Sequence, residues 1–280
     1  MFTVSSASAL ISANALNSAT YDANKASERI STGKRINRAS DDPSGLIRAM
    51  TLKADIGSYT KALDNINGGI EAMDKVATAL ASIYDILTEM RTMADSAISE
   101  SDADTIAAYR YDFDQYVTDI GTLSDQVTVA GAGVMDGTPS SVTIQVGTST
   151  TSTRTFDYVN TSASTLTVSG LDFADTSVAY TNTIASNAVS AVDIALDIIE
   201  GYIATIAANQ KVLDINTDFV NSMIKNESIA YGKIMDANLA EETANMAAAQ
   251  IRQTSAAAML AQSNTMNKDI VTYLLRVYTG

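Results

Sequence analysis

Apolar residues recur at alternating intervals of three and four along much of the chain, which is the spacing of a coiled-coil seam. The longest such row covers residues 49–98 and has one polar interruption, Arg91. Gly68 and Gly69 are expected on the opposite face of this helix, where they weaken it without breaking the row. The pattern predicts a helix from Pro43 to about residue 99, roughly 85 Å long at 1.5 Å per residue. The seam residues of its central part are Leu63, Ile66, Ile70, Met73, Leu80 and Leu87.

Two later segments have the same period, over residues 106–127 and 196–234. A second apolar row runs beside the last one, so we expect that helix to contact two neighbours. The prediction is a mostly α protein in which long antiparallel coiled-coil rods form a bundle of three helices. The seam residues of the last rod are Ile199, Ile203, Ile206 and Leu213, and its second row is Ala195, Ile198, Tyr202, Val212, Phe219 and Met223.

The middle of the chain has a different composition, rich in Ser, Thr, Val and Gly. Three runs favour short strands, at residues 142–147, 154–159 and 165–173. Asp136-Gly137 and the Ser/Thr tracts are typical of turns. We therefore expect a small β region inserted between the second and third rods. The tract 148–155 fits either a carrier of O-linked sugars or an ordinary solvated turn.

The two ends carry few large apolar side chains among many Ala, Ser and Asn residues. Small residues let helix axes approach closely, but each buries little apolar area. Because isolated helices are marginal in water, we expect both ends to order only against partners. The residues that we assign to this association are Leu10, Ile11, Leu16, Ile30, Ala240, Ala244, Ala247, Ile251, Ala258, Leu260, Ile270 and Leu274.

Composition and charge exclude several classes of catalytic site and binding partner. The 280 residues include no His, Cys or Trp, and 18 Lys and Arg against 32 Asp and Glu give a net charge of −14. These facts exclude a Ser-His-Asp triad, a Cys nucleophile, a disulfide and haem or iron–sulfur ligation. The acidic balance argues against nucleic acid and anionic membranes as partners. We predict no enzyme activity, no cofactor and no metal site.

Two features bear on location. No segment reaches the ~18 consecutive apolar residues of a membrane-spanning helix, so we predict no membrane insertion. The first twenty residues lack the charged start, compact apolar stretch and cleavage site of a secretory signal. The composition leaves two alternatives: a cytoplasmic protein, or one that leaves the cell by another route.

The acidic and basic clusters are explained by their expected roles at helix ends, without any catalytic role. Asp41 or Asp42 precedes Pro43 and can accept hydrogen bonds from the first N–H groups of a helix. Asp102 and Asp104 are better explained by an acidic helix start than by a calcium loop, because the required Gly is missing. The one basic cluster is expected near the C-terminal end of a first helix that stops around Gly33, and comprises Lys25, Arg29, Lys34, Arg35 and Arg38.

Motifs at both ends resemble those of bacterial flagellin, the subunit of the flagellar filament. ERISTGKRINRASDDPSGL (28–46) resembles its N-terminal signature, and ANLAEETANMAAAQIRQTSAAAMLAQSNTMNKDIVTYLL (237–275) resembles its C-terminal signature. VMDG (134–137) and IQVG (144–147) are similar to short pieces that flank the small β segment of the family. The resemblance implies a short form without the large outer domains.

The resemblance also implies a domain plan. Residues 1–42 and 236–280 would pair as terminal helices in an inner coiled coil that forms the filament core. Residues 43–130 and 184–235 would form the helical rod domain. Residues 131–183 would be its small β-rich segment, facing outward.

The implied function is self-polymerisation into a hollow helical filament for swimming motility. The protein would be secreted through the flagellar export apparatus to the extracellular flagellum. Its partners would be other copies of itself, an export chaperone on residues 238–275, and the filament cap and hook-junction proteins. The alternatives are the hook–filament junction protein, in which Asp-Asp-Pro is commoner, and a soluble coiled-coil scaffold.

The stretch 87–97 corresponds to the part of flagellin that an innate Toll-like receptor recognises. Leu87 and Arg91 match that pattern. Glu89 stands where recognised flagellins usually carry Arg, and such a reversed charge weakens an interface. The resemblance therefore implies poor receptor activation.

Overall fold

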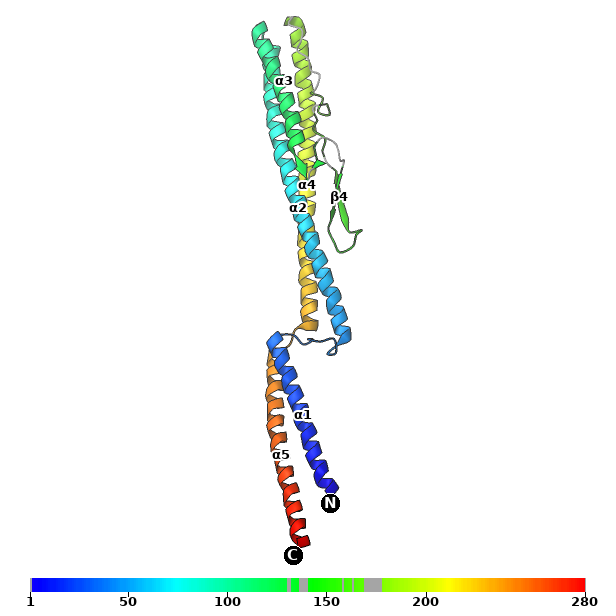
Figure 1. Ribbon diagram of the computed structural model, residues 1–280. Helices are drawn as coiled ribbons and strands as arrows, with labels where there is room; N and C mark the ends of the chain where they lie inside the picture. Colours follow the sequence, from blue (N-terminus) through cyan, green and yellow to red (C-terminus); the bar gives the residue numbers. More distant parts are fainter. Residues whose placement is uncertain are drawn as a thin grey trace. The chain divides into compact units, whose positions relative to one another are not determined.

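The computed structural model describes residues 2–129, 132–135, 141–157, 159–162, 164–168 and 178–279. Helices dominate these residues, as predicted (Figure 1). The helices are α1 (Phe2–Thr32), α2 (Pro43–Ile98), α3 (Ala103–Gln126), α4 (Val178–Met235) and α5 (Leu239–Thr279), and the strands are β1 (Thr128–Val129), β2 (Ala132–Gly133), β3 (Ser141–Gln145) and β4 (Thr153–Asp157).

The contacts divide the chain into two compact units. Residues 1–54 and 226–280 form one, called here the terminal unit, and residues 55–225 form the other, called the rod unit. Because α2 and α4 are long, each contributes to both units.

In the rod unit α2 and α4 run antiparallel. The Gln210 amide donates to Asp74 Oδ1 over 2.7 Å, and Arg91 Nε donates to Asp193 Oδ1 over 2.6 Å, so residue numbers rise along one helix as they fall along the other. The predicted pairing of the two long helices is confirmed. Their shared core buries seven of the ten seam residues (Ile66, Met73, Leu80, Leu87, Ile199, Ile206 and Leu213), and the other three (Leu63, Ile70 and Ile203) pack against it half-buried.

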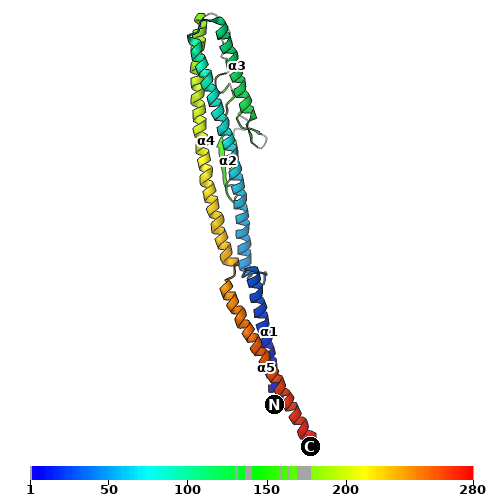
Figure 2. The ribbon, with the colours of Figure 1, turned by 90° about the vertical axis from the view of Figure 1, so that its left-hand side faces the viewer.

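The third helix covers only part of this pair. Figure 2 shows α3 beside one end of α2 and α4, and α3 has 24 residues against 58 in α4. The second apolar row of α4 is therefore buried at Ala195 but exposed at Phe219. The second helix therefore covers only part of this row, because α3 is too short to reach the rest.

The strands form two antiparallel pairs, β1 with β2 and β3 with β4. Ile144 is the buried residue of β3 and Phe156 that of β4. The Ile144 side chain occupies the space beside Gly69 of α2, where a Cβ would collide with it. The expectation that Gly69 lies on the far face is wrong, whereas a Cβ on Gly68 would meet open space.

The prediction of a third strand at residues 165–173 is also wrong for residues 165–168, the part that the structure describes. Residues 164–167 form turns, in which Leu166 N–H donates to Ser162 O over 3.0 Å and Thr167 has φ +59°. Ser and Thr hydroxyls stabilise turns by local hydrogen bonds, and Ser162 Oγ lies 3.0 Å from Thr165 Oγ1. Residues 169–173 and the predicted turn at Asp136-Gly137 lie outside the described residues.

In the terminal unit α1 and α5 pair side by side and antiparallel. Ser8 Oγ lies 2.9 Å from Ser263 Oγ near one end, and Arg29 Nη1 donates to Glu242 Oε1 over 2.8 Å near the other. The predicted pairing of the terminal helices is confirmed. The buried residues between them are small or polar: Ser12, Ala19, Ala26, Glu242, Ala249, Ala256 and Ser263.

Candidate functional site

The segment between α1 and α2 is fastened to the end of α4. Gly33 has φ +69°, a conformation that glycine adopts easily, and it ends α1 where the sequence predicted. Arg35 N–H then donates to Met235 O over 2.6 Å, and Ala237 N–H donates to Gly33 O over 2.9 Å. These backbone hydrogen bonds join the connection between α1 and α2 to the connection between α4 and α5.

Asp41 and Asp42 have separate structural roles. Asp42 Oδ1 accepts from Gly45 N–H over 2.8 Å and caps α2, and this hydrogen bond holds the pKa of Asp42 below its usual value. Asp41 Oδ2 accepts the N–H groups of Asn37 and Arg38, which lower the pKa of Asp41, and Lys25 contributes less. The prediction of helix capping is confirmed for Asp42. Asp41 instead accepts hydrogen bonds from the backbone of the segment before α2.

Four of the five residues of the basic cluster, all except Lys34, form ion pairs within the described part of the terminal unit. The Arg29–Glu242 pair was not foreseen, because a helix-spaced pattern does not show which residue of a distant helix will face a given cation. Glu242 is buried with only 7% of its surface exposed, so its charge is matched by Arg29 rather than by water. The remaining pairs are Lys25–Asp41, Arg35–Asp42 and Arg38–Glu28.

The residues assigned to association lie mostly away from the α1–α5 contact. Leu10, Ile11 and Ile251 are 63%, 69% and 67% exposed. The small stripe of α5 (Ala240, Ala244, Ala247 and Ala258) is exposed as well, and Leu16, Ile30, Leu260 and Ile270 are half-buried. The Leu274 side chain lies outside the described residues. Within the chain, α1 therefore contacts a different stripe of α5, the one that contains Ala249 and Ala256.

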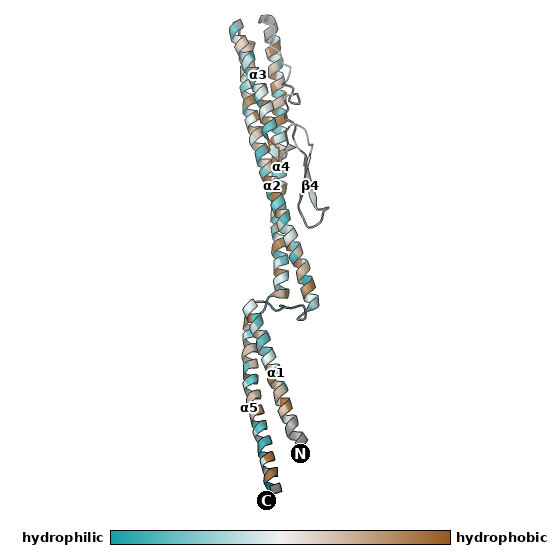
Figure 3. Cartoon of the chain, in the orientation of Figure 1, coloured by the Kyte–Doolittle hydropathy of each residue, from teal (hydrophilic) through white to brown (hydrophobic). Residues whose placement is uncertain are grey.

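Exposed large hydrophobic residues gather in the terminal unit. Of those found in the described residues, five lie in the rod unit and thirteen in the terminal unit, although the terminal unit is the smaller. Figure 3 shows hydrophobic positions recurring along α1 and α5. The thirteen are Leu10, Ile11, Tyr21, Ile47, Met50, Ile229, Leu239, Ile251, Met259, Met266, Val271, Tyr273 and Leu275.

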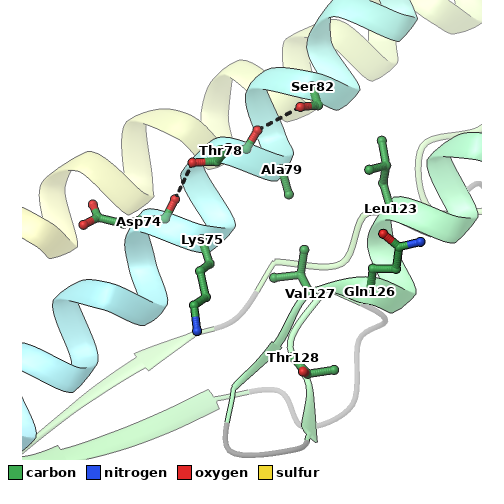
Figure 4. A pocket seen from close by; sticks show the side chains of 9 residues that line it. All are labelled: Asp74, Lys75, Thr78, Ala79, Ser82, Leu123, Gln126, Val127 and Thr128. Atoms are coloured by element: carbon green, nitrogen blue, oxygen red, sulfur yellow. Dashed lines mark hydrogen bonds between the residues drawn. The ribbon is translucent and has the colours of Figure 1, made fainter.

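A hollow of about 610 Å³ in the rod unit offers no catalytic arrangement (Figure 4). It lies between α2 and the end of α3, and two of its hydroxyls bond to the α2 backbone: Thr78 Oγ1 donates to Asp74 O and Ser82 Oγ donates to Thr78 O. The Asp74 carboxylate accepts from Gln210. Across the described part of the chain, no three metal-ligating side chains come together.

The three residues considered for receptor recognition do not share one surface. Leu87 is fully buried in the rod core, so its side chain is not part of the exposed surface in this structure. Arg91 is exposed but pairs with Asp193, which raises the pKa of the Arg91 guanidinium. Glu89 is exposed to solvent.

Similarity to known proteins shows the family of this chain. Among the described residues, none of the helices carries a stretch suited to crossing a membrane. The bacterial flagellin N-terminal helical region matches residues 4–140, and the bacterial flagellin C-terminal helical region matches residues 189–274. The chain belongs to the bacterial flagellin family. It is thus a flagellin, a structural and non-enzymatic subunit of the extracellular flagellar filament.

Relatives of this flagellin match it along most of their length. Flagellin FljO of Caulobacter vibrioides is 27% identical over 270 residues, which is 94% of each chain. A flagellin of Halalkalibacterium halodurans is 28% identical over 253 residues, covering 89% of this chain and 91% of its own. The short form is therefore shared with these relatives.

A solved structure supports the fold alone. The putative flagellar hook-associated protein from Vibrio parahaemolyticus superposes with a TM-score of 0.59 at 14% identity, over 70% of this flagellin and all of that chain. The helical architecture is thus common to both proteins.

Proposed function

We propose that this flagellin enters the filament by burying the exposed apolar faces of α1 and α5 against neighbouring copies. Self-polymerisation follows from its family, and the proposal concerns which surfaces carry it. The supporting observation is the concentration of exposed large hydrophobic residues in the terminal unit. Surfaces of this kind mark sites of protein association.

The small residues between α1 and α5 explain why the pair needs neighbours. A buried methylene-sized group contributes about 0.8 kcal/mol, whereas a fully buried Leu or Ile contributes about 1.5–3 kcal/mol. The α1–α5 contact uses Ala and Ser, and leaves Leu10, Ile11 and Ile251 in solvent. Most of the hydrophobic stabilisation of these helices is therefore gained only when another copy covers them. Ordering and polymerisation would then be coupled.

A non-closing contact between copies produces an open helical fibre. In this arrangement α1 and α5 form the inner core, the helical rods the next layer, and the segment 131–183 faces outward. The exposed residues of β4 agree with that placement, because Phe156 is its buried residue and the rest are exposed.

Before assembly, the exposed apolar residues of α5 must be shielded from water by another protein. Leu239, Met259, Met266 and Tyr273 are all exposed. We assign residues 238–275 to an export chaperone, and the exposed faces of the terminal unit to contacts with the filament cap and hook-junction proteins.

Fibre growth tests the proposal. Purified protein, seeded with short fragments or salted out, should form micrometre-long filaments visible by negative-stain electron microscopy. A double substitution of Ile11 and Ile251 by Ser should prevent growth, since it removes apolar surface without touching the α1–α5 contact. Normal filaments from that variant would refute the assignment.

A further inference from the structure

The terminal unit contains an apolar groove that its own chain does not fill. The groove measures about 470 Å³ and lies between the start of α2 and the end of α4. Ile47, Leu52, Ala230 and Ile234 give it walls that are almost wholly apolar, and Ile47 is 66% exposed. A groove of this kind suits one or two large apolar side chains from a partner.

Two cations border the groove. Arg48 and Lys233 line it, and neither has an anionic partner in the described part of the chain. A partner that fills the groove should therefore bring apolar side chains flanked by carboxylates.

Such a surface exists on the rod unit of the same sequence. Val212, Ile215 and Phe219 are spaced by three and four residues on α4, so they share one helix face, and they are 36%, 59% and 53% exposed. They account for three of the five exposed large hydrophobic residues found in the described part of the rod unit. This face, called here the α4 stripe, combines Ile215 with Val212 and Phe219, two exposed residues of the second row.

The charges beside the stripe complement those of the groove. Asp214 and Asp218 are exposed, and no ion pair holds either carboxylate in the described residues, whereas Lys211 is the one cation within 211–219. The stripe segment thus carries a net charge of −1. On the larger scale, the rod unit has 23 Asp and Glu against 7 Lys and Arg, while the terminal unit has 9 against 11. Net charges of −16 and +2 favour contact between unlike units.

The faces around Leu10, Ile11 and Ile251 are weaker candidates for the groove. Leu10 and Ile11 have no charged neighbour in sequence, and Ile251 precedes Arg252, whose charge is paired with Asp22 over 3.2 Å. None of these three residues has a carboxylate neighbour in sequence that could face Arg48 and Lys233.

We propose that the groove at Ile47, Leu52, Ala230 and Ile234 receives the α4 stripe of a second copy of this flagellin. The contact joins the terminal unit of one molecule to the rod unit of another. Because the two surfaces differ, the contact is head-to-tail and can propagate without closing. The inference rests on the proposed self-assembly and specifies one of its interfaces.

Cysteine cross-linking tests the contact directly, because the natural chain has no Cys. Full-length Phe219→Cys and Ala230→Cys chains are mixed, polymerised from seeds and oxidised, and the products are separated on a non-reducing gel. A disulfide-linked dimer should form in the mixture and not with either variant alone. The matched control replaces Phe219→Cys by Ile194→Cys, another exposed apolar residue of α4, and should give no dimer.

A second measurement removes the stripe without a new bond. Phe219→Ser should raise the critical concentration for polymerisation about tenfold, the effect of losing roughly 1.5 kcal/mol of apolar burial per copy. Since Phe219 is half exposed, the far-UV circular dichroism of the monomer should stay unchanged. Reversing Asp214 and Asp218 to Lys should also weaken assembly, and reversing Arg48 and Lys233 to Glu in the same chain should restore it.

The outcomes separate this interface from the proposed function. If the unaltered chain forms no filaments, the proposed function fails. If it forms filaments, but the Phe219/Ala230 mixture gives no dimer and Phe219→Ser polymerises at the normal concentration, this interface alone is wrong. A dimer of equal yield in the Ile194 control would also overturn it.

Discussion

At the scale of single residues, adjacent glycines of α2 have opposite surroundings. A Cβ added to Gly69 would collide with Ile144 of β3 and would lie 3.5 Å from Leu213 Cδ1. Nothing lies within 4 Å of the corresponding Cβ position on Gly68. A seam pattern assigns both to the outer face, because a helical period does not reveal where an inserted hairpin will pack. The close approach of β3 to α2 therefore depends on Gly69.

This difference gives a paired prediction. Gly68→Ala should stabilise the rod unit by up to about 1 kcal/mol, the helix preference of Ala over Gly. Gly69→Ala gains the same preference but forces Ile144 aside, which costs about 1–3 kcal/mol. Thermal unfolding followed by circular dichroism should place Gly69→Ala below Gly68→Ala. In an Ile144→Ala background the two substitutions should become equivalent, and a persistent difference there would contradict the explanation.

The carboxylates before α2 predict a response to acid. The backbone N–H groups that bind Asp41 and Asp42 lower both pKa values from 3.8. A group whose folded pKa is depressed stabilises the fold above its unfolded pKa, and that contribution is lost as pH falls through the lowered value. The segment 33–42 should therefore loosen only below about pH 3.8.

Hydrogen exchange of the segment 33–45 measures this loosening. Exchange, corrected for its intrinsic pH dependence, should accelerate below that pH in the natural chain. Asp41→Ala should show fast exchange already at pH 7, because Asn37 and Arg38 lose their acceptor. Asp85→Asn in the rod unit serves as the control and should leave exchange of this segment unchanged.

At the scale of elements, periodicity predicted helices better than it predicted their neighbours. The starts of α2 and α3 followed from Pro43 and from Asp102, whose side chain accepts from Thr105 N–H. The seam between α2 and α4 followed from large residues at regular spacing. The partial cover of α4 did not, since it depends on the length of α3. The turn at 164–168 was missed because its Val and Leu residues are buried without forming a strand.

The α1–α5 pair was predicted, but its contact stripe was not. Ala residues occur on every face of α5, so composition cannot distinguish the stripe with Ala249 from the one with Ala247. In the structure Ala249 is fully buried and Ala247 is exposed.

A larger side chain should therefore have different effects at Ala249 and at Ala247. Ala249→Leu should overpack the pair and destabilise it by about 1–3 kcal/mol. Ala247→Leu should leave the monomer unaffected. Limited proteolysis of the terminal helices in dilute monomer, followed by mass spectrometry, distinguishes the two. Equal protection of both variants would show that the α1–α5 contact is not formed in solution.

At the scale of the whole molecule, the two units have different requirements. The rod unit buries large seam residues within one chain, whereas the terminal unit leaves thirteen large hydrophobic residues exposed among those that the structure describes. Deleting residues 1–30 or 245–280 should thus leave a helical protein that stays monomeric at concentrations where the full chain polymerises. Analytical ultracentrifugation and electron microscopy provide the readouts. Filaments built from either deletion would contradict the role of the ends.

The uneven division of charge has a consequence for the finished appendage. With the rods in its outer layer, each added copy brings a net charge of −14 to the shaft, because its rod unit carries −16 and its terminal unit +2, and the whole becomes a long polyanion. Sodium would merely screen such a shaft, but magnesium or calcium would condense on it and draw neighbouring shafts into bundles. The concentration of divalent cations would then decide whether neighbouring filaments stay apart or associate.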